Sequence, residues 1–445
     1  MNLKEILTSV KDTDDLLIGS GVIENCASLF RKHWPGKNGL IVADSNTWAA
    51  GGERLGTLLD GEGIFLLPPL IFGVPPLLHA DYTGVELIIN QVVNPRDTIL
   101  IAVGSGTIND LVKRASFELN QEYLCFGTAA SMDGYCSSGA ALARDGLKQT
   151  LACPAPKVIV ADTDILKTAP GASSAAGYGD LASKLTAGAD WIIADFTGDD
   201  PIDESVWNIV QPRLGVWLAE PAKLRAGNPD VLAAVFEGLN FSGLAMQVLG
   251  RSRAASGAEH LFSHIWEMSG HLGADGNPVS HGFQVSLGIL CVTALMEEVF
   301  RLKAHEIDIE QALRQYPSWD SRVLEIESFM GCFPSYTEYF DICREKYLSR
   351  DELQIKLSRL KEGWEELKSN VWKKLPHYSE MKSMLELAGC PVSPGDINLD
   401  RATALSTYRK AQCMRNRYTI LDLAYELGIL DRCVGRIDRN QLYLN

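Results

Sequence analysis

The strongest constraint on the fold is a change of pattern at about residue 162. Before that point, short apolar runs alternate with amphipathic segments such as residues 84–93, which predict a helix. Three of these runs predict buried strands: Gly39–Ala43, Thr98–Val103 and Tyr123–Phe126. Alternation of this kind is typical of a parallel sheet with helices on its faces. Because helical periodicity dominates afterwards, we predict an α/β domain over residues 1–162 and an all-helical domain over residues 163–445.

The end of the α/β region contains a predicted hairpin. Asp145-Gly146 is typical of a tight hairpin turn, and Lys157–Ala161 is the predicted returning strand. Downstream helices are predicted from their apolar spacing over residues 180–194, 231–249, 256–272, 283–302 and 353–368.

Composition excludes several classes of protein. A net charge of −15 over 445 residues argues against a general nucleic-acid or anionic-membrane surface, although it leaves room for a small anionic substrate. The longest apolar run, Ile64–Leu78, contains four prolines and is too short to span a membrane. Ten cysteines without a Cys-x-x-Cys pair indicate reduced thiols and not a disulfide framework. We expect a cytoplasmic protein.

The turn after the second predicted strand is a candidate phosphate site. Gly104-Ser105-Gly106-Thr107-Ile108 follows the strand and opens a helix that extends to about Glu118. Glycines let the backbone approach a ligand, and a helix N-terminus offers N–H groups and partial positive charge to phosphate. The spacing differs from Gly-x-Gly-x-x-Gly, and a strand-to-helix turn without a ligand also explains it.

Two further polar segments follow predicted strands. Thr128, Ser131, Asp133 and Ser137 belong to a loop rich in small and hydroxyl residues after the third strand, where ligands of open α/β folds bind. Asp44 follows the first strand and suits either a ribose contact or a helix N-cap. A plain surface loop explains the first segment equally well.

The stretch from Ser256 to His264 carries two histidines one helical turn apart. Ser256 and Glu259 predict a capping box, so that His260 and His264 share a face of the helix that follows. Two imidazoles in this arrangement form a common metal-site geometry. Core histidines that hydrogen-bond inside the protein explain the pair as well.

Two residues elsewhere in the chain complete a candidate metal set. Asp180 is predicted at a helix start, where N-capping is the plainer explanation, and His281 stands at another predicted helix start beside Gly282. With His260 they form one carboxylate and two imidazoles, which suit Zn²⁺, Fe²⁺ or Ni²⁺. His271 is the main rival for the position of His281.

Taken together, these motifs resemble sn-glycerol-1-phosphate dehydrogenase, a family grouped with iron-containing alcohol dehydrogenases, glycerol dehydrogenase and dehydroquinate synthase. The resemblance rests on five segments in the same order, from the Gly104 turn to His281-Gly282, and covers about residues 35–290. It implies a dehydroquinate synthase-like fold, with a Rossmann-like α/β domain that binds NAD(P) and an all-α domain. A homo-oligomer is also expected.

The resemblance assigns roles to these residues. Asp180, His260 and His281 would hold one divalent metal, with zinc expected ahead of nickel or iron. Asp133, Asp180 and His264 would contact the substrate, with Asp180 and His264 catalytic. The cofactor NAD or NADP would be bound by Asp44, Gly104, Ser105, Gly106, Thr107, Ile108, Thr128, Ser131 and Ser137. Arg251 and Arg253 are open candidates for the substrate phosphate.

The implied reaction interconverts dihydroxyacetone phosphate and sn-glycerol 1-phosphate with NAD(P). Asp44 favours NAD over NADP, because a carboxylate repels a 2′-phosphate. The alternatives are a polyol dehydrogenase for an unphosphorylated substrate, a lyase like dehydroquinate synthase, and a catalytically silent helical binding protein. The lyase needs clustered Lys and Arg that residues 128–290 lack, and the silent protein would be expected to have lost a metal ligand.

Overall fold

The computed structural model describes residues 2–73, 78–144 and 147–445, and the chain divides into two compact units. The sheet unit comprises residues 1–181 and 208–251, and the helical unit comprises residues 182–207 and 252–445. Helix α8 (Gly171–Thr197) passes from the first unit into the second, and α9 (Glu204–Val210) passes back.

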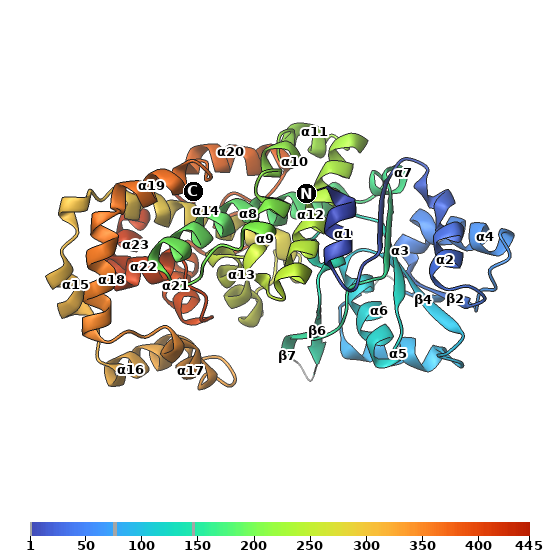
Figure 1. Ribbon diagram of the computed structural model, residues 1–445, viewed down its shortest axis with the longest axis horizontal. Helices are drawn as coiled ribbons and strands as arrows, with labels where there is room; N and C mark the ends of the chain where they lie inside the picture. The colour runs from blue at the N-terminus through green and yellow to red at the C-terminus, as the bar shows by residue number, and fades with distance from the viewer. Residues whose placement is uncertain (1, 74–77, 145–146) are drawn as a thin grey trace. The chain divides into compact units, whose positions relative to one another are not determined.

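The sheet unit is built on one six-stranded parallel sheet of order β1-β8-β5-β4-β2-β3. Its strands are β1 (Asp15–Gly19), β2 (Asn38–Asp44), β3 (Leu70–Phe72), β4 (Thr98–Gly104), β5 (Tyr123–Gly127) and β8 (Val158–Asp162). Figure 1 shows two of its neighbouring strands, β4 and β2, side by side. A separate antiparallel hairpin joins β6 (Ala140–Arg144) to β7 (Leu147–Leu151). Since β4 and β5 are buried along their whole length, the middle of the sheet is covered on both faces, as parallel sheets require.

Helices cover both faces of this sheet. The helices of the sheet unit are α1 (Leu3–Ser9), α2 (Cys26–His33), α3 (Ser45–Thr47), α4 (Glu53–Gly61), α5 (Tyr82–Gln91), α6 (Gly106–Glu118), α7 (Thr163–Leu166), α10 (Leu214–Trp217), α11 (Pro221–Arg225) and α12 (Pro229–Leu249), with the short 3-10 helices η1 (Val22–Asn25) and η3 (Asp133–Cys136) and the short π-helix η2 (Trp48–Gly52). Phe30 of α2 and Leu55 of α4 share one core with Ile41 and Ile101 of the strands. Alternate strand residues therefore point to α2 and α4, while α6 packs on β4 from the other face.

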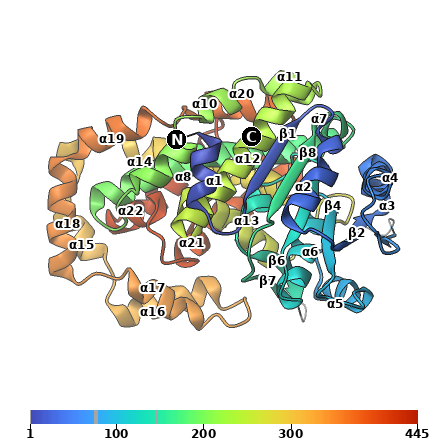
Figure 2. The ribbon, with the colours of Figure 1, turned by 45° about the vertical axis from the view of Figure 1, so that its right-hand side comes forward.

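The helical unit contains no named strand among its described residues, all of which lie beyond β8. Its helices are α13 (Ala258–Met268), α14 (His281–Phe300), α15 (Ile309–Gln315), α16 (Trp319–Met330), α17 (Glu338–Glu345), α18 (Arg350–Glu362), α19 (Trp364–Trp372), α20 (Tyr378–Ala388), α21 (Arg401–Cys413), α22 (Ile420–Glu426) and α23 (Leu430–Arg439), with η4 (Ser252–Ala254), η5 (Ala304–Glu306) and η6 (Pro394–Ile397). α14 packs along α13, which also contacts α21. Figure 2 shows α16 and α17 side by side within this unit.

Two helices, α12 and α14, are long and apolar enough to cross a membrane by length and composition alone. The most apolar windows of these helices are 61% and 89% buried inside the protein. Burial of this kind is typical of core helices in soluble proteins.

The predicted α/β region is confirmed. The three predicted strands are β2, β4 and β5, the helix over 84–93 is α5, and the last strand of the sheet ends at Asp162. The strands β1 and β3 were missed, because neither is buried along its length and β3 has only three residues. The boundary between domains at residue 162 stays a prediction.

The predicted hairpin exists, but its returning strand is wrong. β6 pairs with β7, whereas Lys157–Ala161 falls on β8, which pairs in parallel with β5 and β1. The predicted turn residues Asp145 and Gly146 lie outside the described residues. A short apolar run shows that a strand forms, but it does not show which strand becomes its partner.

Three predicted helix boundaries are also wrong. Asp180 lies well inside α8 and is not an N-cap. α13 begins at Ala258 after Gly257, so Ser256 does not cap it and no capping box forms there. The helix predicted over 353–368 is interrupted at Gly363, between α18 and α19.

Candidate functional site

In the sheet unit, the chain turns sharply from β4 into α6. A Cβ added at Gly104 would lie 2.6 Å from Cβ of Ile108, so the turn admits no side chain at this position. Ser105 is the N-cap of α6, and the first N–H groups of a helix have no acceptor inside it. The turn therefore directs the N–H groups of Gly106 and Thr107 toward whatever binds at the end of β4.

The loop that follows β5 lies beside this turn and is held from behind by a buried lysine. Thr128 donates its N–H to the carbonyl of Gly104 at 3.0 Å. Nζ of Lys113, on α6, donates to the carbonyl oxygens of Gly134, Ser137 and Gly139 at 2.7, 3.0 and 3.1 Å. Lys113 is 1% exposed, so it holds the loop in shape and is not available as a surface charge.

Asp44 ends β2, whose neighbour in the sheet is β4. Its Oδ1 accepts the N–H groups of Asn46 and Thr47 at 2.8 and 2.9 Å, and Oγ1 of Thr47 accepts the N–H of Asp44. Asp44 is thus the N-cap of α3, the plainer of its two predicted roles. A ribose contact would have to use the same carboxylate.

Asp133 and Asp180 are neighbours in the sheet unit. Oδ2 of Asp180 accepts the N–H of Asp133 at 2.9 Å. Oδ2 of Asp133 in turn accepts a hydrogen bond from the hydroxyl of Ser242, on α12, at 3.0 Å. Because Asp180 is fully buried, this pair has a defined orientation.

In the helical unit, three histidines gather where α14 begins beside α13. The ring centroids of His260 and His281 are 5.2 Å apart, and His264 lies 6.3 Å from His260 and 6.1 Å from His281. His260 is 7% exposed, whereas the side chains of His264 and His281 keep about a third of their surface. The i,i+4 spacing places the first two rings on one face, and the start of α14 brings the third.

Carboxylates orient two of these rings. Oε1 of Glu259 lies 2.9 Å from Nδ1 of His260, and Oε1 of Glu267 lies 3.0 Å from Nδ1 of His281. Burial would raise the pKa of Glu259, but its hydrogen bond to His260, the charge of that ring and the N–H of Gly257 together lower it. A proton on Nδ1 makes Nε2 the ligand atom of each ring, which is the usual histidine arrangement at protein metal sites.

His264 differs from the other two rings. Desolvation lowers its pKa, against the opposing effect of Glu267 and with a smaller contribution from His281 and His260. The ring is therefore neutral at neutral pH, and its hydrogen bonds to a ligand add no positive charge to the site.

Two features far apart in the sequence set the position of α13. The buried carboxylate of Asp190, on α8, accepts the N–H of Ala258 at 2.7 Å, while Glu259 accepts that of Gly257 at 2.6 Å. A Cβ at Gly288 of α14 would lie 2.4 Å from the carbonyl oxygen of Glu259. The absence of a side chain at Gly288 thus allows the close packing that brings His281 to His260.

In the helical unit, His260 and His281 each offer an imidazole nitrogen, with ring centroids 5.2 Å apart, and in the sheet unit the buried Asp180 offers a carboxylate oxygen. These are the three residues that the sequence predicted as metal ligands. His271 is not among them, because it follows the end of α13 and its Nε2 hydrogen-bonds the carbonyl of Ile397 at 2.6 Å. One carboxylate oxygen and two imidazole nitrogens suit a divalent metal of the zinc, iron or nickel type.

Arg253 does not lie on a ligand-binding surface. Its guanidinium is buried and donates to the carbonyl oxygens of Tyr418 and Asp190 at 2.9 and 2.8 Å. It therefore supports the chain around α13, and its candidacy as a phosphate ligand is wrong.

Sequence reasoning missed Glu267 and Lys113, and it took Glu259 only for a capping residue. An acidic residue adjacent to a candidate ligand histidine, or three residues away on the same helix, was an available signal for the two glutamates. No local pattern identified Lys113, whose acceptors lie 21 to 26 residues away in sequence.

Comparisons with known proteins agree with this geometry. The family model described as iron-containing alcohol dehydrogenase matches residues 17–170. A glycerol-1-phosphate dehydrogenase [NAD(P)+] of Halalkalibacterium halodurans is 30% identical over 382 residues, which cover 86% of this chain and 84% of the relative. A protein of the same name from Geobacillus thermodenitrificans is 30% identical over 400 residues, covering 89% and 88%.

Solved structures show the same fold at lower identity. Glycerol dehydrogenase from Schizosaccharomyces pombe has a TM-score of 0.60 at 16% identity, covering 96% of this chain and 91% of that one. An iron-containing alcohol dehydrogenase from Thermococcus thioreducens has a TM-score of 0.57 at 14% identity, covering 96% and 99%.

Proposed function

Since the chain belongs to the glycerol-1-phosphate dehydrogenase family, among the iron-containing alcohol dehydrogenases, we propose that it interconverts dihydroxyacetone phosphate and sn-glycerol 1-phosphate with NAD(P). The observation that carries this proposal is the pair of imidazoles of His260 and His281, whose ring centroids are 5.2 Å apart and each of which faces a carboxylate. A plain binding protein has no need of two imidazoles backed by carboxylates.

Asp180, His260 and His281 would hold one divalent metal, for which we propose zinc ahead of nickel or iron. The donor set fits such an ion, because Glu259 and Glu267 leave Nε2 of each ring as the ligand atom. When bound, the metal supplies positive charge that stabilises the negative charge developing on the substrate oxygen.

The nucleotide would bind at the end of β4 and β5. The N–H groups from Gly104 to Ile108 would receive the pyrophosphate, with Thr128, Ser131 and Ser137 along the neighbouring loop. Asp44 would reach the ribose only if it shares or gives up its capping bonds. The nicotinamide supplies or accepts the hydride.

Asp133 and His264 would contact the substrate. Ser242 and Asp180 hold Asp133 in one orientation, and the neutral ring of His264 can hydrogen-bond a substrate hydroxyl. Because Nδ1 of His264 faces Glu267 at 3.7 Å, the ring can take a proton at one nitrogen while the other releases one on that side. Asp180 would orient the substrate as well as the metal.

We also propose that the protein acts in the cytoplasm as a homo-oligomer, without a nucleic-acid or membrane partner. Ten free cysteines, nine of them buried, support a reducing compartment. The oligomer is carried over from the family alone.

A substrate panel tests the reaction. The purified protein is loaded with zinc, nickel or iron and given NADH or NADPH with dihydroxyacetone phosphate or with unphosphorylated dihydroxyacetone. We expect loss of nicotinamide absorbance with the phosphorylated ketone. Loss with only the unphosphorylated ketone would make the protein a polyol dehydrogenase, and no loss with either would refute the proposal.

A further inference from the structure

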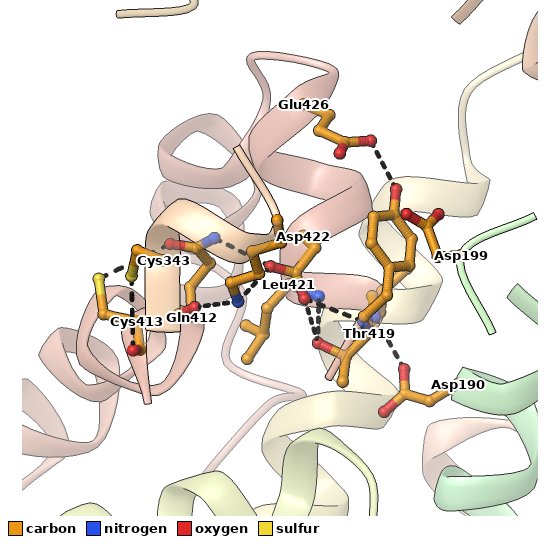
Figure 3. A network of polar contacts seen from close by, with 12 residues as sticks. Asp190, Asp199, Cys343, Gln412, Cys413, Thr419, Leu421, Asp422 and Glu426 are labelled. Carbon is orange, nitrogen blue, oxygen red and sulfur yellow. Dashed lines mark hydrogen bonds and ion pairs between the residues drawn. The ribbon is translucent and has the colours of Figure 1, made fainter. Parts of the chain in front are cut away.

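Two buried cysteines of the helical unit lie close together. Both are far along the sequence from the residues assigned above to the metal, the cofactor and the substrate. Cys343 lies on α17 and Cys413 is the last residue of α21, 70 residues further along the chain. Sγ of Cys343 lies 3.5 Å from the carbonyl oxygen of Cys413, a contact that Figure 3 marks with a dashed line.

Positive charge surrounds this pair. Nη2 of Arg322, on α16, lies 3.4 Å from Sγ of Cys413 and 3.9 Å from Sγ of Cys343. Nζ of Lys346 donates to the backbone carbonyl of Gln412 at 2.6 Å, directly before Cys413. The guanidinium is 3% exposed, so its charge is only weakly screened by solvent.

The surroundings make this pair unlike the other cysteines of the unit. The interaction with Cys343 lowers the pKa of Cys413 against the effect of burial, and the charges of Arg322 and Lys346 add to this lowering. Burial instead raises the pKa of Cys291 to about 12 and that of Cys433 to about 11. The pair therefore favours a thiolate at Cys413, and a thiolate is the form of cysteine that oxidants attack.

The same charges argue against a metal at these sulfurs. A cation would meet Arg322 at contact distance, whereas a thiolate is stabilised by it. The acidic neighbours Glu325 and Asp422 are already engaged, Glu325 with Arg322 at 2.9 Å and Asp422 with Lys346 at 2.6 Å.

A small cavity reaches Cys343 of the pair. Its walls include Arg322, Cys343, Lys346 and Gln412, and its volume is about 20 Å³. An oxidant as small as hydrogen peroxide fits this space, whereas a bulky peptide disulfide requires a larger opening.

We propose that Cys343 and Cys413 are a modification site, at which hydrogen peroxide converts the two thiols into a reversible disulfide. The thiolate of the pair attacks one peroxide oxygen, the O–O bond breaks, and the hydroxide that leaves takes the proton of the remaining thiol. The second sulfur then attacks the sulfenic acid formed, the S–S bond forms, and the S–O bond breaks. The departing hydroxide takes a proton from solvent, so that one peroxide oxidises two sulfurs and yields two waters.

The test follows each cysteine in the intact, metal-loaded protein, without reference to its dehydrogenase activity. The protein is treated with limiting hydrogen peroxide, alkylated, digested without reductant and mapped by mass spectrometry. We expect a Cys343–Cys413 disulfide to form about tenfold faster than Cys332 is oxidised, although Cys332 is the exposed cysteine. Dithiothreitol should restore both thiols.

Variants separate the pair from its surroundings. Cys413→Ser and Cys343→Ser should each abolish the cross-linked peptide, and Cys433→Ser, which changes a buried cysteine outside the pair, should retain it. The proposal is overturned if Cys332 reacts while the pair stays reduced, if either cysteine ends as a sulfinic acid, or if the cross-link appears only after denaturation. Since the wild-type map alone decides the first two outcomes, a variant that fails to fold leaves the test intact.

Discussion

Two polar clusters in the helical unit have opposite electrostatic surroundings. His260 and His281 face the carboxylates of Glu259 and Glu267, at 2.9 and 3.0 Å. The thiols of Cys343 and Cys413 instead face the guanidinium of Arg322. In both clusters, the charge of the side chain that faces the histidine or the cysteine determines the reactivity of that histidine or cysteine.

The difference explains why one cluster suits a metal and the other does not. Carboxylates behind the imidazoles keep a nitrogen of each ring available as a ligand and add negative charge, so that a cation is favoured. Cations beside the thiols favour a thiolate but repel a metal. Thiolates are good metal ligands in general, so the charge of the neighbours and not the type of ligand separates these two sites.

The largest expected effect is on the histidine side. His260→Ala should abolish stoichiometric metal binding, measured by elemental analysis, and lower dehydrogenase activity by more than about a hundredfold, because the remaining residues cannot complete the ligand set. His264→Ala is the matched control on the same helix and should keep the metal while losing activity. If His260→Ala retained the metal and His264→Ala lost it, His264 would be the metal ligand and His260 the substrate contact.

Removing the carboxylate behind the ring should have a smaller effect. Glu259→Gln keeps an oxygen for the N–H of Gly257 but removes the charge facing His260. We expect metal affinity, measured by competition with a chelator, to fall by about ten- to a hundredfold. Glu310→Gln changes an exposed glutamate of the same unit and should leave affinity unchanged. Equal metal affinities in the two variants would show that the carboxylate of Glu259 does not affect metal binding by His260.

Packing of α13 on α14 can be tested at Gly288. Gly288→Ala puts a Cβ 2.4 Å from the carbonyl oxygen of Glu259, so the helices must separate. Chemical denaturation should show a loss of about 1–3 kcal/mol in the free energy of unfolding, with weaker metal binding. At Gly435, also helical, a Cβ meets only Nη1 of Arg439, at 3.7 Å, and Gly435→Ala should be neutral or slightly stabilising. A stable Gly288→Ala protein with normal affinity would contradict this view of the packing.

The smallest effect concerns pH and the thiol side. The pKa of Cys413 is lowered below its ordinary value of 9.0 in the folded protein, first by its interaction with Cys343 and also by Arg322 and Lys346. Below pH 9 the folded state therefore binds fewer protons than the unfolded state, so the pair adds stability that grows as the pH rises toward 9 and is lost as the pH falls through the lowered pKa.

Chemical denaturation of the wild type and of Cys413→Ser at pH 6 and pH 8.5 measures the contribution of the pair to the free energy of unfolding. The wild type should gain about 1 kcal/mol or more over this interval relative to the variant. Taking the difference between the two proteins cancels the pH dependence that other buried groups contribute. Asp190 is one such group, because burial raises its pKa to about 7. Identical pH profiles would show that the pair remains protonated.

Much of the fold was predictable because its signals are local. β2, β4 and β5 are runs of apolar residues that are buried on both faces, and the Gly104 turn follows directly from its sequence. Predicted helix boundaries were wrong where another segment of the chain supplied the hydrogen-bond acceptor. Ser256 resembles an N-cap, yet Asp190 of α8 and Glu259 accept the first N–H groups, so α13 begins two residues later.

The amino-acid sequence alone determined the parallel sheet, the tight strand-to-helix turn at Gly104 and the shared face of His260 and His264, because periodicity and turn chemistry act over a few residues. Only the tertiary structure decided which ring faces Glu267, which helix needs Gly288, and that Cys343 meets Cys413 across 70 residues. The physical reason is that charge and desolvation in a buried site depend on distances through space. Those distances are set by how helices pack, and no local pattern in the chain encodes them.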